Sequence, residues 1–125
     1  MAYEESTVTI NAVAGEAMSV FRFVAPQSDQ TWDMADAATE LISGISAEAV
    51  ATGKVFPVTT FNGAVGMIEL GATIAAGVMV SSGTNGVAAA ASTTTNQIVV
   101  GPLLVGGDSG EIVPIVLAMR TIAPA

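Results

Sequence analysis

Short runs of apolar residues alternate with polar turns along this chain, and the runs predict β-strands. The most distinct pair covers residues 55–61 and 64–70, which are rich in β-branched and aromatic types and flank Asn62-Gly63. Asn-Gly between such runs is typical of a two-residue hairpin turn, because a type I′ turn needs two residues with φ > 0. The sequence therefore predicts a hairpin from residue 55 to residue 70.

Both faces of this predicted hairpin are mostly apolar. With Phe61 opposite Ala64, one face carries Val55, Pro57, Phe61, Ile68 and Leu70. The other face carries Phe56, Val58, Val65 and Met67. A hairpin at a solvated surface alternates apolar with polar residues, so we expect both faces to be covered. One cover is the domain's own core, and we expect the face with Phe56, Val58, Val65 and Met67 at a subunit interface. This register needs an N–H that Pro57 lacks, which predicts a bulge or an edge strand there.

Further strands are expected on both sides of the hairpin. Residues 18–25 form an apolar run in which Arg22 is the one charge, and residues 78–82 and 87–91 flank a polar Gly-Thr-Asn-Gly turn. Apolar runs at 98–105 and 111–119 follow, joined by a glycine-rich turn. Residues 32–34 either pair back as a strand or begin a short helix that continues to Ile42. The chain is therefore predicted to be mainly β, with little helix.

An internal echo indicates two similar halves. Residues of the same type recur 56 or 57 positions apart: Gly44 and Gly101, Pro57 and Pro114, and Val24 and Val80. The change of offset is what one deletion would cause. Two matched β units around a pseudo-twofold axis would form a small barrel or sandwich. Chance recurrence of short strands and turns is the alternative.

Composition narrows the class of protein. The chain has 125 residues, enough for one domain with a real core, and 51% of them are hydrophobic. Only 11% are charged, against roughly 25% in an ordinary soluble domain. So little charge leaves apolar surface, which favours a stable homo-oligomer or a permanent partner. The net charge of -8 gives no electrostatic footprint for nucleic acid or an anionic membrane. No signal peptide or membrane span is recognisable, so we expect a soluble chain made in the cytoplasm.

The first 17 residues have the character of an arm, followed by a single β-rich domain over residues 18–125. The short strand-like run of the arm, Thr7 to Ile10, lies between Glu4-Glu5 and Gly15 and need not join the core. Extended termini of this kind add a strand to the sheet edge of another protein. A locally docked end is the alternative.

No set of residues offers a catalytic or cofactor site. Gly107-Asp108-Ser109-Gly110 copies part of a serine-protease motif, but the chain contains no histidine to act as the base. Turn chemistry explains these residues, and nothing places Lys54 beside Ser109 as an alternative base. Asp33, Asp36 and Glu40 would share one side of a helix, and a solvated acidic face explains them better than a cation site, because calcium needs six to eight oxygen ligands. We expect no enzyme, no cofactor and no metal.

One stretch resembles a known family. A hairpin is followed by Gly71-Ala-Thr-Ile-Ala-Ala-Gly77, an apolar strand, a polar turn and an alanine-rich strand. This order resembles the decoration, or cement, proteins of tailed-phage heads, loosely from residue 21 to residue 117. The acidic run at residues 29–40 departs from the family pattern.

The resemblance implies a β-tulip-like domain that binds the outside of an assembled head as a trimer and stabilises contacts between major capsid proteins. It also implies a virion location and an N-terminal arm against the capsid, formed by Tyr3, Thr7, Val8, Thr9 and Ile10. A carbohydrate-binding or tail-associated adhesion module is the alternative. Such a module needs an aromatic-lined groove, and only 5% of the residues are aromatic.

Overall fold

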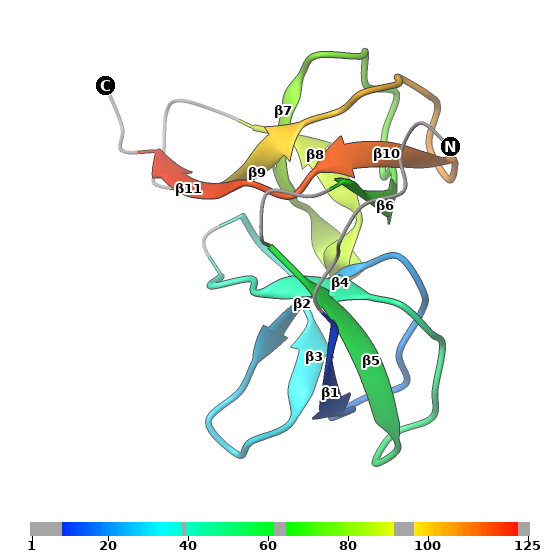
Figure 1. Ribbon diagram of the computed structural model, residues 1–125, viewed down its shortest axis with the longest axis vertical. Helices are drawn as coiled ribbons and strands as arrows, with labels where there is room; N and C mark the ends of the chain where they lie inside the picture. The colour runs from blue at the N-terminus through cyan, green and yellow to red at the C-terminus, as the bar shows by residue number, and fades with distance from the viewer. Residues whose placement is uncertain (1–8, 39, 62–64, 92–96, 123–125) are drawn as a thin grey trace.

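The protein is mainly β, as predicted. A computed structural model describes residues 9–38, 40–61, 65–91 and 97–122, without the side chains of 97 and 119–122. Antiparallel strands in these ranges form three sheets of five, two and four strands (Figure 1). The sheets pack as a small sandwich-like fold and do not close into a barrel, so the sandwich is the correct one of the two expected architectures.

The first part of the chain builds the five-stranded sheet. Its strands are β1 (Thr9–Val13), β2 (Phe23–Pro26), β3 (Trp32–Met34), β4 (Gly44–Ser46) and β5 (Val55–Thr60). They follow the order β1-β5-β4-β2-β3. Residues 32–34 therefore pair back as a strand, with Trp32 opposite Pro26, and the alternative of a helix to Ile42 is wrong.

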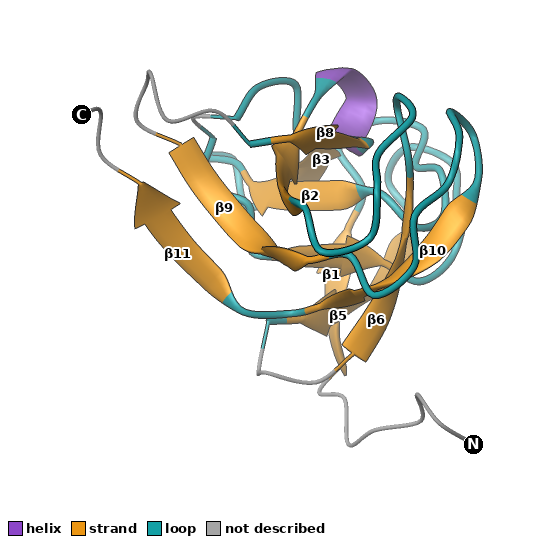
Figure 2. Ribbon diagram, turned by 90° about the horizontal axis from the view of Figure 1, so that it is seen from above, coloured by secondary structure: helices purple, strands orange, loops and turns teal. Residues whose placement is uncertain are grey.

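The second part builds the other two sheets. Its strands are β6 (Val65–Glu69), β7 (Met79–Ser82), β8 (Ala88–Ala90), β9 (Gln97–Pro102), β10 (Ile112–Val116) and β11 (Met119–Ile122). β10 pairs with β6, and the four-stranded sheet has the order β11-β9-β7-β8. A three-residue 3-10 turn, Thr84–Gly86, connects β7 to β8 (Figure 2). No helix in the described ranges is long and apolar enough to cross a membrane.

The two parts repeat one pattern of strand pairing, which confirms the echo in the sequence. Thr9 pairs with Thr59 in the first part, and Val65 pairs with Val116, 56 and 57 positions later, in the second. The same offsets relate further pairs: Val24 with Met34 and Val80 with Ala90, Ala14 with Trp32 and Leu70 with Ala88, and Met18 with Val50 and Ile74 with Gly107. We call residues 9–61 repeat 1 and residues 65–122 repeat 2. Repeat 1 lies in the lower part of Figure 1 and repeat 2 in the upper part.

The sequence predicted that the two repeats face each other across a pseudo-twofold axis. The hydrogen bonds between the repeats show that they do not. The backbone N–H of Glu69 in repeat 2 donates to the carbonyl of Phe21 in repeat 1, at 3.0 Å. A twofold axis would also join the equivalent residues, Val13 and Gly77. Instead Val13 is 39% exposed, and no hydrogen bond joins it to Gly77. At this hydrogen bond the repeats therefore meet head to tail, each through a different surface, and elsewhere both contribute to one buried hydrophobic cluster.

The predicted hairpin between residues 55 and 70 is wrong. β5 pairs with β1 and β4, whereas β6 pairs with β10. The reason is the repeat: β5 is the last strand of repeat 1 and β6 is the first strand of repeat 2, so each completes its own unit. The Asn62-Gly63 turn lies outside the described residues.

Pro57 fits its strand because of where β4 ends. Ala47 N–H donates to the Pro57 carbonyl at 3.0 Å. The return bond that proline cannot give would fall at Ala47, one residue beyond the end of β4. The predicted bulge or edge strand is therefore wrong: β5 lies between β1 and β4, and the missing bond falls where β4 has ended.

Candidate functional site

Two of the five predicted arm residues belong to the folded domain. Thr9 and Ile10 lie in β1, which pairs with β5 along its whole length, and Ala12 of the same strand is buried. Tyr3, Thr7 and Val8 lie outside the described residues. The described domain thus includes Thr9–Val13, which the prediction of an arm over residues 1–17 had placed outside it, as the alternative of a locally docked end had it.

Among the described residues β1 pairs along its length with β5 alone, so its other edge is open. Ala14 N–H donates to the Lys54 carbonyl, which sets the register and directs the backbone groups of Ala12 and Ile10 toward β5. The N–H and C=O groups of Asn11 and Val13 consequently point away from β5. An unpaired strand edge of this kind is a template for pairing with another chain.

The four residues predicted at a subunit interface do not form one surface. Phe56 and Val58 are completely buried, in a cluster with Ala12, Ala14, Met18 and Val24, so their place at a surface is wrong. Val55, which was expected on the core face, is 61% exposed. The faces of β5 are inverted because the strand pairs with β1 and not with β6. Val65 and Met67 lie on β6, half-buried and 37% exposed, and their role at an interface stays a prediction.

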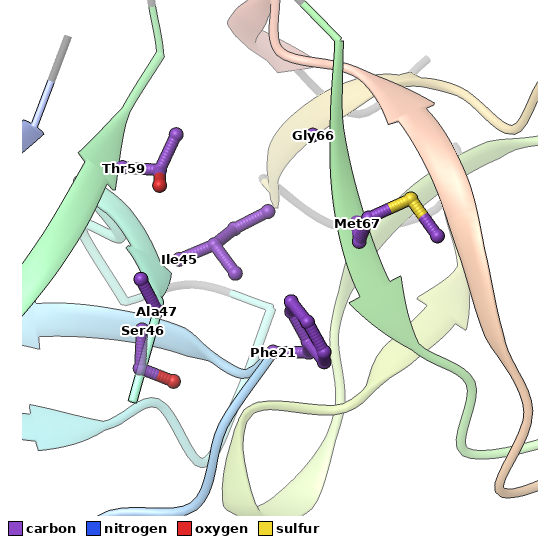
Figure 3. Close-up of a pocket in the computed structure, with 7 residues that line it drawn as sticks. All are labelled: Phe21, Ile45, Ser46, Ala47, Thr59, Gly66 and Met67. Carbon is purple, nitrogen blue, oxygen red and sulfur yellow. The ribbon is translucent and has the colours of Figure 1, made fainter. Parts of the chain in front are cut away.

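A small apolar cavity marks the contact between the two repeats. Repeat 1 supplies Phe21, Ile45, Ser46, Ala47 and Thr59 to its lining, and repeat 2 supplies Gly66 and Met67. Figure 3 shows Phe21 and Ile45 directed toward β6, which carries the two residues of repeat 2. No charged side chain belongs to this lining, whose polar side chains are the hydroxyls of Ser46 and Thr59, and the cavity lies at the contact between the repeats.

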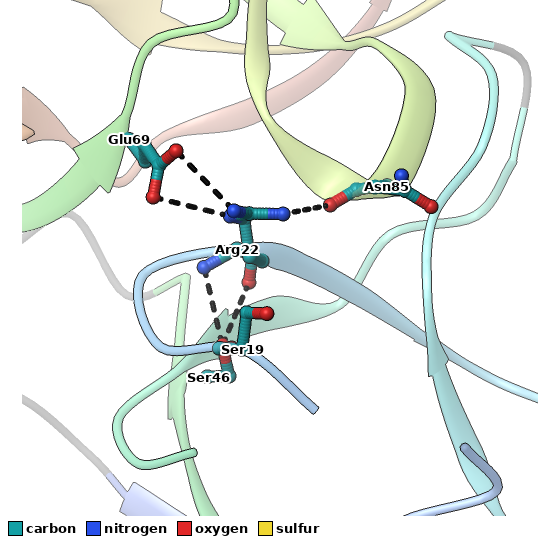
Figure 4. A network of polar contacts seen from close by, with 5 residues as sticks. All are labelled: Ser19, Arg22, Ser46, Glu69 and Asn85. Atoms are coloured by element: carbon teal, nitrogen blue, oxygen red, sulfur yellow. Dashed lines mark hydrogen bonds and ion pairs between the residues drawn. The ribbon is translucent and has the colours of Figure 1, made fainter. Parts of the chain in front are cut away.

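Arg22 joins the repeats beside this cavity. Its guanidinium contacts both carboxylate oxygens of Glu69, at 3.2 and 3.4 Å, and donates to the Asn85 carbonyl at 3.0 Å (Figure 4). Its backbone N–H donates to the Ser46 hydroxyl, which in turn donates to the Ser19 carbonyl at 2.6 Å. The Arg22 and Glu69 side chains are 17% and 25% exposed. Arg22 thus fixes one repeat against the other.

Apolar side chains also gather on the outer surface of β6 and β10. Leu104 N–H donates to the Pro114 carbonyl, and Pro114 pairs with Met67, so the buried Pro114 lies between the exposed Leu104 and Met67. Leu104, Met67, Val105 and Ile112 are 37 to 45% exposed. Apolar groups on neighbouring strands make a surface that suits a protein partner.

The acidic residues at 33, 36 and 40 do not share a helix face. Asp33 lies on β3, and its Oδ1 atom is buried with no hydrogen-bond partner in the described part of the chain. Burial, and then the negative charges of Asp29, Asp36 and Glu40, raise the pKa of Asp33. Asp36 N–H donates to Glu40 at 2.6 Å, and Asp36 accepts from Asn85 N–H at 3.2 Å. In the described ranges no three His, Cys, Asp or Glu side chains are grouped to hold a metal ion.

The protease-like residues lie in a turn. Glu111 N–H donates to the Asp108 carbonyl, and the Asp108 side chain accepts from Thr73 at 3.1 Å. Lys54 occupies the equivalent turn of repeat 1, where its N–H donates to Ala51. The turn explanation is thus sufficient, and Ser109 and Lys54 belong to different turns.

Sequence reasoning missed Arg22 and Glu69 as partners. The signal was weak: each is a lone charge on an apolar strand, and a lone charge among buried residues needs a partner. Aligning the two repeats would have put Val78 and Val13 at the equivalent positions, which shows that only one of the two surfaces carries the ion pair.

Comparison by sequence finds no protein-family model and no curated protein that matches this chain. Comparison by structure finds the N base of head fiber gp8.5 in bacteriophage phi29. The match has a TM-score of 0.70 and covers 90% of this chain and 95% of that one, at 19% sequence identity. The two proteins share a fold over nearly their whole lengths.

Proposed function

We propose that this protein is a structural component of a phage head, bound to the outer surface of the capsid as a trimer. The observation that supports the proposal most is the shared fold with the base of a phage head fiber, at a TM-score of 0.70 over 90% of the chain. The order of elements from Gly71 to Ala91 supports it independently, through its resemblance to head decoration proteins. In this role the protein stabilises contacts between major capsid proteins.

Surface chemistry is consistent with this role. The net charge of -8 suits an exterior position away from packaged DNA. Exposed apolar residues on β1, β6 and β10 suit contacts with protein. Each capsid contact of one chain need not be strong, because a trimer engages three sites together and effective concentration raises the overall affinity. A protein that binds only the assembled shell stabilises the shell by mass action.

In the part of the chain that the structure describes, no feature favours an adhesion module. Trp32, which is the only tryptophan, packs against the buried cluster of repeat 1. Its ring is therefore half-buried against residues of its own domain.

Co-sedimentation with purified mature heads tests the proposal. We expect the protein to pellet with heads and to raise the temperature at which they release DNA. Binding to an immobilised glycan array without binding to heads would contradict it.

The contribution of the N-terminal arm needs a truncation that spares β1. Removal of residues 1–8 takes away Tyr3, Thr7 and Val8 and leaves β1 whole, whereas removal of residues 1–12 also deletes most of a strand of the sheet. We expect the first truncation to weaken head binding. Unchanged binding would exclude the arm from the capsid contact.

A further inference from the structure

Around the cavity, the contact between the two repeats uses one surface from each, and the described residues leave the equivalent pair of surfaces unjoined. Repeat 1 contributes a face with Phe21, Ala47 and Thr59, and repeat 2 contributes the β6 edge with Gly66, Met67 and Glu69. The equivalent face on repeat 2 carries Gly77, Leu104 and Val116. The equivalent edge on repeat 1 is β1, with Ile10, Asn11 and Val13. We call these two the repeat 2 face and the β1 edge.

Both open surfaces are accessible. Ile10 and Val13 are 40% and 39% exposed, and Leu104 on the repeat 2 face is 37% exposed. Gly77 is exposed and Val116 is half-buried. Equivalent positions differ in two cases on the covered face of repeat 1: Phe21 is half-buried where Gly77 is exposed, and Ile45 is 2% exposed where Pro102 is half-buried. β6 covers the face of repeat 1, whereas no described strand covers the repeat 2 face in the same way.

The backbone of the two open surfaces is complementary. Within the chain, Glu69 N–H donates to the Phe21 carbonyl, and Phe21 has a positive φ of 60°. Gly77 occupies the equivalent position with a φ of 84°, so its carbonyl is presented in the same way. Val13 N–H points away from β5, as Glu69 N–H points away from β10. The same backbone hydrogen bond is available between Val13 and Gly77.

The side chains are complementary in a different way. Arg22 and Glu69 form an ion pair in the contact inside the chain. The equivalent positions are occupied by Val78 and Val13, so both members of this pair are apolar. A valine opposite an arginine would leave a charge unpaired, whereas two valines bury each other favourably.

We propose that a second copy of this chain docks its β1 edge on the repeat 2 face, so that Val13 lies against Val78 and bonds to Gly77. The contact reproduces between chains the one that joins the repeats within a chain. A head-to-tail contact forms a ring when its rotation closes and an open filament when it does not, and the trimer of the proposed function requires closure. The inference deepens the trimer of the proposed function: three chains would form a ring of six repeats.

Single charges on each surface test this contact by analytical ultracentrifugation. Val13→Glu blocks the β1 edge, and Leu104→Glu blocks the repeat 2 face. The fold accommodates the first change, because Glu69 stands at the equivalent position of repeat 2. We expect each variant to weaken self-association at least tenfold, the equivalent of about 1.4 kcal/mol. Leu41→Glu is the matched control, since Leu41 is 72% exposed and lies on neither surface.

Two combinations distinguish this contact from any other. An equal mixture of the two blocked variants should yield dimers and nothing larger, because one intact edge meets one intact face. Val13→Glu with Val78→Arg in the same chain should restore assembly, because it recreates the Arg22 and Glu69 pair. Failure of both combinations, or assembly of Val13→Glu equal to that of the control, would overturn the proposal.

Cross-linking gives a second readout that does not depend on weakened association. Asn11 and Leu104 are equivalent to Met67 and Ala47, which line the same cavity. The chain has no cysteine, so Asn11→Cys with Leu104→Cys should form a disulfide only between chains. Asn11→Cys with Leu41→Cys should not. A monomeric protein that binds heads would contradict this contact and support head binding. An oligomeric protein that does not bind heads would support this contact and contradict head binding.

Discussion

Arg22 and Glu69, 47 positions apart, form an ion pair of 3.2 Å that ties repeat 1 to repeat 2. Both side chains are largely shielded from solvent, so loss of one leaves the other charge poorly solvated. The ion pair therefore stabilises the position of repeat 1 relative to repeat 2. That position determines which residues of the two repeats lie on the protein surface.

Arg22→Val should lower the free energy of unfolding by about 1 to 3 kcal/mol, because Glu69 loses a charged partner. Arg22→Val with Glu69→Val should cost less than the sum of the single changes, since no charge is left unpaired. Urea denaturation of the four proteins in a double-mutant cycle measures the coupling. Additive effects would show that the pair does not link the repeats.

Asp33→Asn should stabilise the protein at neutral pH. Burial raises the pKa of Asp33 in the folded state above its ordinary value of 3.8. At a pH between 3.8 and the raised pKa, the folded state therefore binds more protons than the unfolded state. Stability accordingly falls as the pH rises through that interval, and the ionised carboxylate is unfavourable above it. Thermal unfolding between pH 3 and pH 8 should show a smaller loss in Asp33→Asn than in the natural protein. Glu48→Gln, at an exposed position, should keep the natural profile.

Truncation of two neighbouring residues on β5 should change the free energy of unfolding by very different amounts. Phe56 is fully buried, and Phe56→Ala should cost about 3 to 5 kcal/mol of unfolding free energy. Val55 is 61% exposed, and Val55→Ala should change stability by less than about 0.5 kcal/mol. Chemical denaturation of both variants decides the matter. Equal losses would mean that the faces of β5 are not arranged as described.

Gly44 and Gly101 should tolerate a side chain equally badly, because they hold equivalent places in the two repeats. A Cβ on Gly44 would lie 2.7 Å from the Thr59 carbonyl oxygen, and one on Gly101 would collide with the carbonyl oxygen of Val116. Alanine at either position should cost about 1 to 3 kcal/mol through overpacking. Gly53→Ala is the control for strain alone, since Gly53 has a φ of 84° and open space around it. Calorimetry that ranks Gly53→Ala as the most harmful would contradict this account.

The sequence was informative about local structure and about the repeat. Apolar runs located the strand pair β7 and β8 and the turn between them, because alternation and turn residues are properties of neighbouring positions. The recurrence of Gly44 at Gly101 and of Pro57 at Pro114 predicted two units, since each residue answers the same steric need in both.

The candidate surfaces were harder to predict. Phe56, Val58, Val65 and Met67 were expected together because the runs on either side of Asn62-Gly63 had the properties of a hairpin. Apolar residues on both faces of β5 left its register undetermined by pattern. The choice of β1 as the partner of β5 depended on contacts between residues more than 40 positions apart.

By itself, then, the sequence determined that this protein is a mainly β domain of two similar units with little charge, because composition and periodicity act along the chain. Only the tertiary structure decided that the units meet head to tail, with Glu69 bound to Phe21 and Val13 left open. The physical reason is that the equivalent surfaces of the two repeats both follow the strand pattern of the sequence, and only packing in three dimensions selects which of them is covered.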